Sequence, residues 1–179
     1  MPGKEPIDIS DLNHADAAAA TAIIVPLIER GPNLAMRVIK RRPFAGPDAL
    51  AAAIRAEILE LDNDELIALF RRHPELAPTA PDAMTAESRQ EQGRLGLAAP
   101  VAGVCERLAE LNALYTRKFG FPFIIALHRH DNISSVIAAF ERRLDATLDS
   151  EIAAAREEVA SVSRRRVLAA FAPVEVTPA

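Results

Sequence analysis

Residues 100–118 read PVAGVCERLAELNALYTRK, and this stretch decides the fold class. Its apolar residues follow helical spacing, at Val101, Val104, Cys105, Leu108, Leu111 and Tyr115. That spacing places them on one face of an α-helix. Similar helical patterns fill the rest of the chain, which lacks the alternating pattern of half-buried strands. The sequence therefore predicts an all-α fold, a single-domain compact bundle of about eight helices.

Proline, glycine, asparagine and aspartate separate the segments that we expect to be helical, because such residues start and end helices. The expected helices cover residues 12–29, 34–41, 47–61, 63 to the His73–Pro74 step, 85–98, 100–118, 132–146 and 150–171. Residues 77–83 contain two prolines and are expected to form a loop, while the short apolar run 124–127 fits either a strand or a helix. We expect one domain over residues 1–179, with extended tails at 1–9 and 172–179.

Composition narrows the function classes. The 179 residues carry a formal net charge of −4 with a pI near 5.6, which argues against a nucleic-acid binder because such proteins need a concentrated basic face. The single cysteine, Cys105, excludes an intramolecular disulfide and a cysteine-built zinc site, and it fits a reducing compartment. No apolar run approaches the roughly 18 residues of a membrane helix, and the first residues lack the apolar core of a signal peptide. We therefore expect a cytoplasmic protein without nucleic-acid or membrane partners.

Arg166 breaks the pattern of the last expected helix. Four apolar residues form one stripe at helical spacing, namely Ile152, Ala155, Val159 and Val162, and Arg166 continues that stripe. A guanidinium on an apolar stripe needs an anion, because its desolvation is otherwise costly. Two interpretations fit. Arg166 binds an anionic ligand, or it snorkels at the helix end or pairs with a structural carboxylate.

Ser88, Glu91 and Gln92 are spaced so that a helix places all three on one face. Ser88-x-x-Glu91 also fits a capping box, in which Ser88 would begin the helix. Thr85 offers an earlier start, which would put Ser88 and Glu91 inside the first turns. The sequence leaves both starts open.

His73 stands at the expected end of a helix, directly before Pro74. A helix C-terminus favours a protonated histidine, which suits a proton donor; an ordinary histidine that contacts the last carbonyls is the alternative. His128-x-His130 invites a metal interpretation, but no third protein ligand supports it, so we expect solvated loop residues and no metal site. The chain also lacks a Gly-rich phosphate loop, a nucleophile elbow and the CxxC and HExxH motifs. What remains is acid–base chemistry by histidine and carboxylate, with arginine holding an anionic substrate.

These residues belong to an ordered set of short motifs. The set comprises Arg42-Pro43-Phe44, His73-Pro74-Glu75-Leu76-Ala77, Thr85-Ala86-Glu87-Ser88-x-x-Glu91-Gln92, Gly96-Leu97, Leu111-Asn112-x-x-Tyr115, Lys118-Phe119-Gly120-Phe121-Pro122-Phe123, Arg143-Leu144 and the run from Glu158-Val159 to Arg166-Val167. In this order and spacing, from about residue 10 to 168, they resemble the 2-oxo-4-hydroxy-4-carboxy-5-ureidoimidazoline (OHCU) decarboxylases, which make (S)-allantoin at the end of urate oxidation. The chain departs from the family pattern at Asn33 and Ile39, where tryptophans are common, and at Glu75, where aspartate is usual.

The resemblance implies an all-helical, cofactor-free decarboxylase, often a homodimer, that acts on a small ureidoimidazoline. It also implies that His73 donates a proton and that Glu91 is the catalytic carboxylate. The residues implied to bind the substrate are Pro74, Ser88, Arg89, Gln90, Gln92, Phe123, Ile124, Ile125, Ala126, Leu127 and Arg166. The enzyme hypothesis expects His73, Glu91 and Arg166 to converge on one concave pocket. Two alternatives stay open: a non-enzymatic helical interaction module, and a homologue of the same fold that acts on a related ureido acid.

Overall fold

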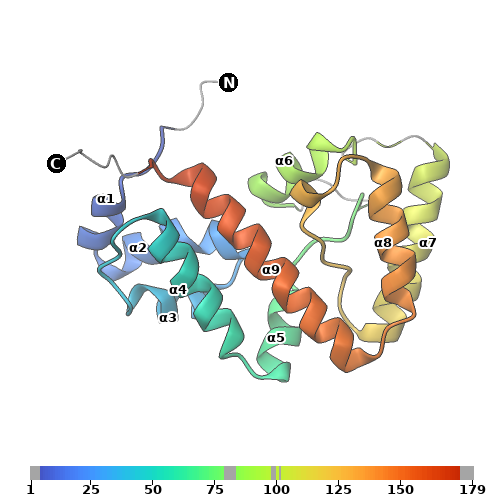
Figure 1. Ribbon diagram of the computed structural model, residues 1–179, viewed down its shortest axis with the longest axis horizontal. Helices are drawn as coiled ribbons and strands as arrows, with labels where there is room; N and C mark the ends of the chain where they lie inside the picture. The colour runs from blue at the N-terminus through green and yellow to red at the C-terminus, as the bar shows by residue number, and fades with distance from the viewer. Residues whose placement is uncertain (1–4, 79–83, 98–99, 101, 174–179) are drawn as a thin grey trace. The chain divides into compact units, whose positions relative to one another are not determined.

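The computed structural model of the chain describes residues 5–78, 84–97, 100 and 102–173 (Figure 1). The α-helices are α1 (Ile9–His14), α2 (Ala17–Ile24), α3 (Pro32–Ile39), α4 (Pro47–Leu59), α5 (Asn63–Phe70), α6 (Ala86–Arg94), α7 (Ala102–Phe119), α8 (Ile133–Leu144) and α9 (Leu148–Ala170), and the short 3₁₀ helices are η1 (Val25–Ile28) and η3 (Leu127–Arg129). Within the described residues no strand forms, and eight of these α-helices have seven or more residues. The all-α prediction and its number of helices are therefore confirmed.

The chain divides into two compact units. The first unit comprises residues 1–60 and 160–179, and the second comprises residues 61–159. Helix α9 begins in the second unit and ends in the first, so it contributes side chains to both. That the two units act as one domain stays a prediction.

The expected helix over residues 12–29 is wrong as a single element, because the chain forms α1, α2 and η1 there. Ala15 has an extended backbone after α1, and the Asp16 side chain then caps α2 by accepting a hydrogen bond from the N–H of Ala19 at 2.8 Å. Pro26 stands in the first turn of η1. The Asp16 carboxylate accepts a hydrogen bond from a backbone N–H that has no partner within the helix. This cap stabilises a new helix start, so the expected single helix is divided in two at residues 15 and 16.

The ends of the described chain meet in the first unit. The N–H of Ile7 donates to the carbonyl of Ala170 at 2.8 Å, and the N–H of Ala172 donates to the carbonyl of Ile7 at 3.0 Å. Of the expected tails, residues 5–8 and 172–173 are not helical, whereas Ile9 already begins α1. Residues 1–4 and 174–179 lie outside the described residues.

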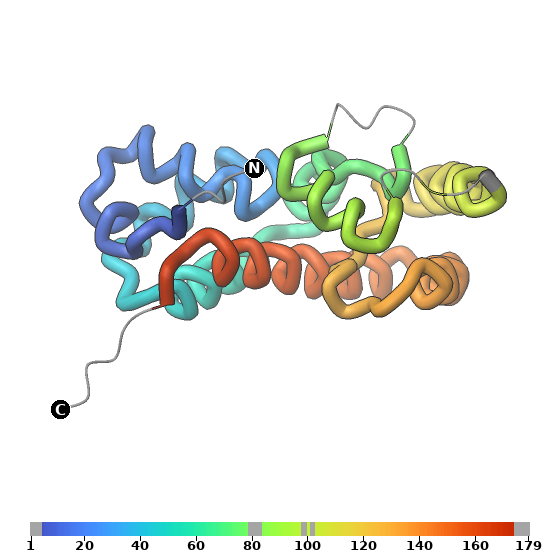
Figure 2. Tube along the Cα trace, turned by 90° about the horizontal axis from the view of Figure 1, so that it is seen from above, coloured from blue at the N-terminus to red at the C-terminus, as the bar shows by residue number. Residues whose placement is uncertain are grey.

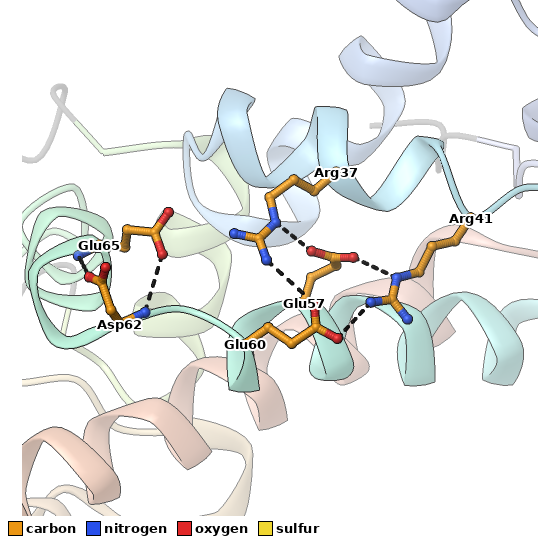
Figure 3. Close-up of polar contacts among 6 residues, drawn as sticks. All are labelled: Arg37, Arg41, Glu57, Glu60, Asp62 and Glu65. Carbon is orange, nitrogen blue, oxygen red and sulfur yellow. Dashed lines mark hydrogen bonds and ion pairs between the residues drawn. The ribbon is translucent and has the colours of Figure 1, made fainter.

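Glu57 on α4 is a buried carboxylate held by two arginines from α3 and the residues just after it (Figure 3). Its two oxygens accept hydrogen bonds from the Nε groups of Arg37 and Arg41, each at 2.5 Å. Glu60 accepts a further bond from Nη2 of Arg41 at 2.9 Å. Burial alone would raise the pKa of Glu57, but the hydrogen bonds from Arg41 and Arg37 outweigh it and hold the pKa below its ordinary value of 4.5. This network ties α3 to α4.

Side-chain caps set the helix starts of the second unit. Asp62 and Glu65 form a capping box at α5, because each carboxylate accepts a hydrogen bond from the other residue's backbone N–H, at 2.9 and 3.2 Å (Figure 3). Thr85 caps α6 by accepting from the N–H of Ser88 at 3.2 Å. Of the two starts that the sequence left open, the earlier one at Thr85 is correct, and Glu91 lies inside the helix.

Some expected boundaries shift. Helix α6 ends at Arg94 rather than at residue 98, because Gly96 takes a left-handed φ of 71° and the N–H of Leu97 bonds back to the carbonyl of Gln92 at 3.0 Å. Helix α4 ends at Leu59 rather than at residue 61. Residues 124–126 form neither a strand nor a helix. Residues 79–83 of the expected loop, and residues 98 and 101 of the expected helices, lie outside the described part of the chain.

An aromatic cluster forms the core of the second unit, where α7 and α8 lie side by side (Figures 1 and 2). The Tyr115 ring on α7 lies with its centroid 4.6 Å from that of Phe119 and 5.2 Å from that of Phe123. The Phe123 ring also stacks on that of Phe140 in α8, with the ring centroids 3.9 Å apart. The cluster therefore fixes the segment that follows α7 against both helices.

Replacing Glu57 with glutamine tests the network between α3 and α4. We expect Glu57→Gln to lower the free energy of unfolding at pH 7 by about 1–2 kcal/mol, the lower part of the range for hydrogen bonds to charged groups, because both arginines are partly exposed. Because the folded-state pKa of Glu57 is lowered, the wild-type advantage is complete above about pH 5 and disappears as the pH falls through that pKa. Urea unfolding between pH 7 and 3 measures both effects.

The matched control is Glu60→Gln, since the Glu60 side chain is 57% exposed and its ion pairs are screened by water. We expect a change below about 0.5 kcal/mol at every pH for this control. Equal losses in the two variants, or a Glu57→Gln loss that persists at pH 3, would contradict this account of the buried carboxylate.

Candidate active site

His73 lies three residues beyond the end of α5, and that helix orients its ring. Its Nδ1 is 3.2 Å from the backbone carbonyl oxygen of Leu69, and its backbone N–H donates to the carbonyl of Phe70 at 3.0 Å. A carbonyl oxygen only accepts hydrogen bonds, so Nδ1 is the donor in this contact. The contact with the last helix carbonyls, which the sequence offered as an alternative for His73, is therefore present. A role of His73 as a proton donor stays a prediction.

Two buried side-chain amides hold the turn that follows this histidine. The Gln92 Oε1 accepts a hydrogen bond from the N–H of Ala77, and its Nε2 donates to the carbonyl of Glu75, both at 2.8 Å. The Asn112 Nδ2 donates to the carbonyl of Leu76 at 2.9 Å. Three successive residues of the turn are thus bonded to α6 and α7, which fixes the turn relative to both helices.

Helix α6 brings its predicted face into the interior of the second unit. Ser88 and Gln92 are buried, with 4% and 3% of their surface exposed, and Glu91 is half-buried. Arg89 and Gln90, which the resemblance assigns to substrate binding, are exposed. The helical spacing therefore identified the packed face correctly, whereas the two exposed residues were named from the resemblance alone.

The segment from residue 121 to 127 is buried throughout, although it has no regular structure before η3. Charged side chains satisfy its backbone: Nη1 of Arg143 donates to the carbonyl of Ile124 at 2.7 Å, and the Glu158 carboxylate accepts from the N–H of Ala126 at 2.8 Å. The carbonyl of Leu127 accepts a bond from Arg94 of α6. A buried irregular backbone needs such partners, because unpaired polar groups are costly away from water.

Tyr115, Arg143 and Glu151 form a polar cluster next to this segment. The Tyr115 hydroxyl and the Arg143 guanidinium both donate to the Glu151 carboxylate, whose side chain is 1% exposed. Burial, followed by the hydrogen bond to Glu151, raises the pKa of Tyr115 far above its ordinary value, so the phenol stays neutral and keeps donating. The same guanidinium carbon lies 4.6 Å from the centroid of the Phe123 ring.

Helix α6 is the common element of these contacts. Through Gln92 it bonds to the turn after His73, and through Arg94 it bonds to the end of the buried segment. The sequence assigned no role to Arg94. Arginine is common in the last turn of a helix, so its position alone does not indicate a function. Asn112 and Arg143 appeared in the motifs without a role; their polar character on otherwise packed helix faces was the available signal.

Arg166 lies in the first unit, whereas the residues described above lie in the second. Its Nη1 donates to the Glu29 carboxylate at 2.7 Å and to the carbonyl of Pro26 at 3.0 Å, and both charged side chains are at most 5% exposed. The structural carboxylate that the sequence offered as an alternative is therefore present. A role of Arg166 in substrate binding stays a prediction.

A search of the described residues finds no group of three or more His, Cys, Asp or Glu side chains that could hold a metal ion. His128 is exposed, and Nδ1 of His130 lies 3.0 Å from the Ser135 hydroxyl. No helix in the described ranges is long and apolar enough to cross a membrane.

Comparisons with known proteins agree with the motif pattern. A sequence model of the family described as OHCU decarboxylase matches residues 13–168. The chain is 30% identical over 161 residues to the 2-oxo-4-hydroxy-4-carboxy-5-ureidoimidazoline decarboxylase of Halalkalicoccus jeotgali, which covers 90% of each chain. It is 32% identical over 163 residues to the protein of that name from Mus musculus, covering 90% of this chain and 91% of the mouse protein.

Two solved structures share the fold. A crystal structure of (S)-allantoin synthase superimposes with a TM-score of 0.72 at 24% identity, covering 93% of this chain and 54% of that chain. A crystal structure of OHCU decarboxylase in the presence of (S)-allantoin superimposes with a TM-score of 0.67 at 20% identity, covering 81% of this chain and 94% of that chain. With most of its length matched by the family model and by relatives of similar size, this chain belongs to the OHCU decarboxylase family.

Proposed function

We propose that this chain converts 2-oxo-4-hydroxy-4-carboxy-5-ureidoimidazoline to (S)-allantoin in urate degradation, and that it does so without a cofactor. One observation carries the proposal: α6, which bears Glu91, is hydrogen-bonded both to the turn after His73 and to the buried segment that ends at Leu127. The named relatives of similar length support the same substrate.

The substrate itself explains why a protein of this kind needs no cofactor. Its carboxylate-bearing carbon is bonded to the carbon of a ring imine. When the carbon–carbon bond to the carboxylate breaks, carbon dioxide leaves and the electron pair passes toward the imine nitrogen, which takes a proton. The resulting enol-amine then accepts a proton on the ureido-bearing carbon while its hydroxyl proton is lost, so the reaction takes up one proton overall. The protein has to position the substrate and deliver a proton to one face.

His73 is the proposed donor to the ureido-bearing carbon. Its Nδ1–H points to the Leu69 carbonyl, so a protonated ring presents the transferable proton on Nε2. The amides of Gln92 and Asn112 hold the backbone beyond Pro74, and this restricts the direction in which the ring can point. A fixed donor is what a product of one handedness requires.

The proposed role of Glu91 is to bind the substrate hydroxyl, or to lie near the carboxylate and disfavour its charged ground state. Ser88 and Gln92 share the Glu91 face and are proposed to bind the ring amides and the ureido group. The Oε1 atom and one Nε2 hydrogen of Gln92 are already bonded to the turn after His73. The second Nε2 hydrogen is therefore the one that we assign to the substrate. Arg89 and Gln90, which are exposed on the same helical turn, are also proposed to contact the substrate.

The buried segment from Phe123 to Leu127 is proposed to form the apolar wall and to offer backbone groups to the substrate. The carbonyl of Ile124 and the N–H of Ala126 already bond to side chains. The N–H groups of Ile124 and Ile125 take no part in those bonds. They are therefore the backbone donors that we assign to the substrate. Pro74, which has no N–H, is proposed to contact the substrate through its ring.

The setting of the enzyme is also part of the proposal. We infer a cytoplasmic location, which a single free cysteine supports, and no nucleic-acid partner, in keeping with the net charge of −4. A homodimer is the expectation from the family resemblance, and light scattering on the purified protein measures it.

The direct test supplies the purified chain with freshly prepared ureidoimidazoline and follows the loss of substrate absorbance against the spontaneous decay. We expect a rate that rises in proportion to enzyme concentration. A rate equal to the spontaneous one would overturn the proposed function. Turnover of a related ureido acid in preference to this substrate would instead select the alternative of a homologue with another substrate.

Replacing the two proposed catalytic groups tests the mechanism. We expect His73→Asn and Glu91→Gln each to lose about 10²–10⁴-fold in turnover while keeping the wild-type circular dichroism spectrum, because a positioned acid contributes about that much. His14→Asn and Glu106→Gln, which change exposed residues, serve as matched controls with wild-type rates. Near-normal turnover in both site variants would remove His73 and Glu91 from the mechanism.

Arg166→Ala separates a structural role from a substrate role. Loss of the guanidinium leaves the Glu29 carboxylate buried, so we expect a lower midpoint of thermal unfolding. If Arg166 also binds the substrate, the variant raises KM, whereas Glu29→Gln keeps a KM close to that of the wild type. An unchanged KM in Arg166→Ala would leave Arg166 with the structural role alone.

A further inference from the structure

Arg94 makes an unusual pair of contacts for an exposed residue at the end of a helix. Its Nη2 donates to the carbonyl of Leu127 and, at 2.8 Å, to the carbonyl of His130. These two residues bracket η3, so a single guanidinium joins the last turn of α6 to both ends of that short helix. Figure 1 shows α6 beside the chain at η3, and the contacts between the two elements agree.

The position of Arg94 on α6 gives these contacts a functional meaning. Glu91 and Gln92 lie within one turn of it on the same helix, and Leu127 ends the buried segment that we propose to form part of the site. Charge-assisted hydrogen bonds are shorter and stronger than neutral ones, and a planar guanidinium orients both acceptors at once. The spacing between α6 and the segment is therefore held at the carbonyls of Leu127 and His130.

We propose that Arg94 is a positioning residue of the decarboxylase site: it sets the distance between α6 and the Phe123–Leu127 segment without touching the substrate. This inference rests on the function proposed above. Arg143 and Glu158 hold the same segment to α8 and α9, through Ile124 and Ala126. Loss of Arg94 therefore leaves the segment folded but loosens its attachment to α6.

The experiment compares Arg94→Ala and Arg94→Lys with Arg107→Ala in the full-length protein. Arg107 is the matched control, because it too is a partly exposed arginine with two partners, Glu110 at 2.5 Å and Glu141 at 2.6 Å. The measurements are kcat and KM for the ureidoimidazoline, the midpoint of thermal unfolding, and hydrogen exchange of the backbone N–H groups of Arg129 and His130.

We expect Arg94→Ala to lower kcat/KM by roughly 10- to 100-fold, mostly through KM. A mutation far from the reacting atoms that shifts a positioning group by about 1 Å can cost about 10²-fold in rate. The amides of Arg129 and His130 should exchange faster, while those in the interior of α7 stay unchanged. Arg94→Lys, which keeps a cation that can reach one carbonyl, should recover part of the loss in KM. Arg107→Ala should match the wild type in kcat and KM.

Several outcomes would overturn the positioning role. These are an unchanged KM in Arg94→Ala, an equal rise in KM in Arg107→Ala, and a loss confined to thermal stability with no faster exchange at η3. An inactive wild-type protein would overturn the proposed function instead, so the two failures are distinguishable. If wild type is active and exchange at η3 rises without any change in KM, Arg94 is structural and the inference is wrong.

Discussion

The candidate site depends on one buried side-chain amide, that of Gln92. Its oxygen accepts from the N–H of Ala77 and its nitrogen donates to the carbonyl of Glu75, so the turn after His73 has a fixed position relative to α6. A buried amide with both ends paired tolerates little displacement, because each lost bond leaves a desolvated polar group behind. The distance between the histidine turn and the helix that bears Glu91 is therefore set by hydrogen bonds rather than by apolar contact alone.

The buried segment that we propose as the apolar wall is held in a similar way, but by charged groups. The backbone from Ile124 to Ala126 has no regular structure, and it is buried together with Leu127, where η3 begins. Arg143, Glu158 and Arg94, from three different helices, supply the missing hydrogen-bond partners. A guanidinium suits this task because its donors lie in one plane and stay charged at any physiological pH. Two arginines and one glutamate thus take the place of a sheet or helix ladder along this buried segment.

The sequence predicted much of the fold and the packed face of α6, and the reasons are local. Helical spacing in α7 reports burial directly, and Thr85 fixes where α6 begins. The end of α5 was expected at the His73–Pro74 step, but the helix already ends at Phe70. The division of residues 12–29 was missed because one aspartate, Asp16, competes with a run of helix-forming alanines, and periodicity does not weigh such caps. The partners of Arg94 and Arg166 could not be predicted, since hydrogen bonds to backbone carbonyls distant in sequence leave no spacing pattern.

The handedness of the product tests the central claim most directly, because it depends on a proton arriving from one fixed side. Circular dichroism of the allantoin formed by the purified protein, measured faster than the product racemises, reports that handedness. The account predicts almost pure (S)-allantoin from the wild-type chain. Racemic allantoin, formed at the uncatalysed rate, would contradict it.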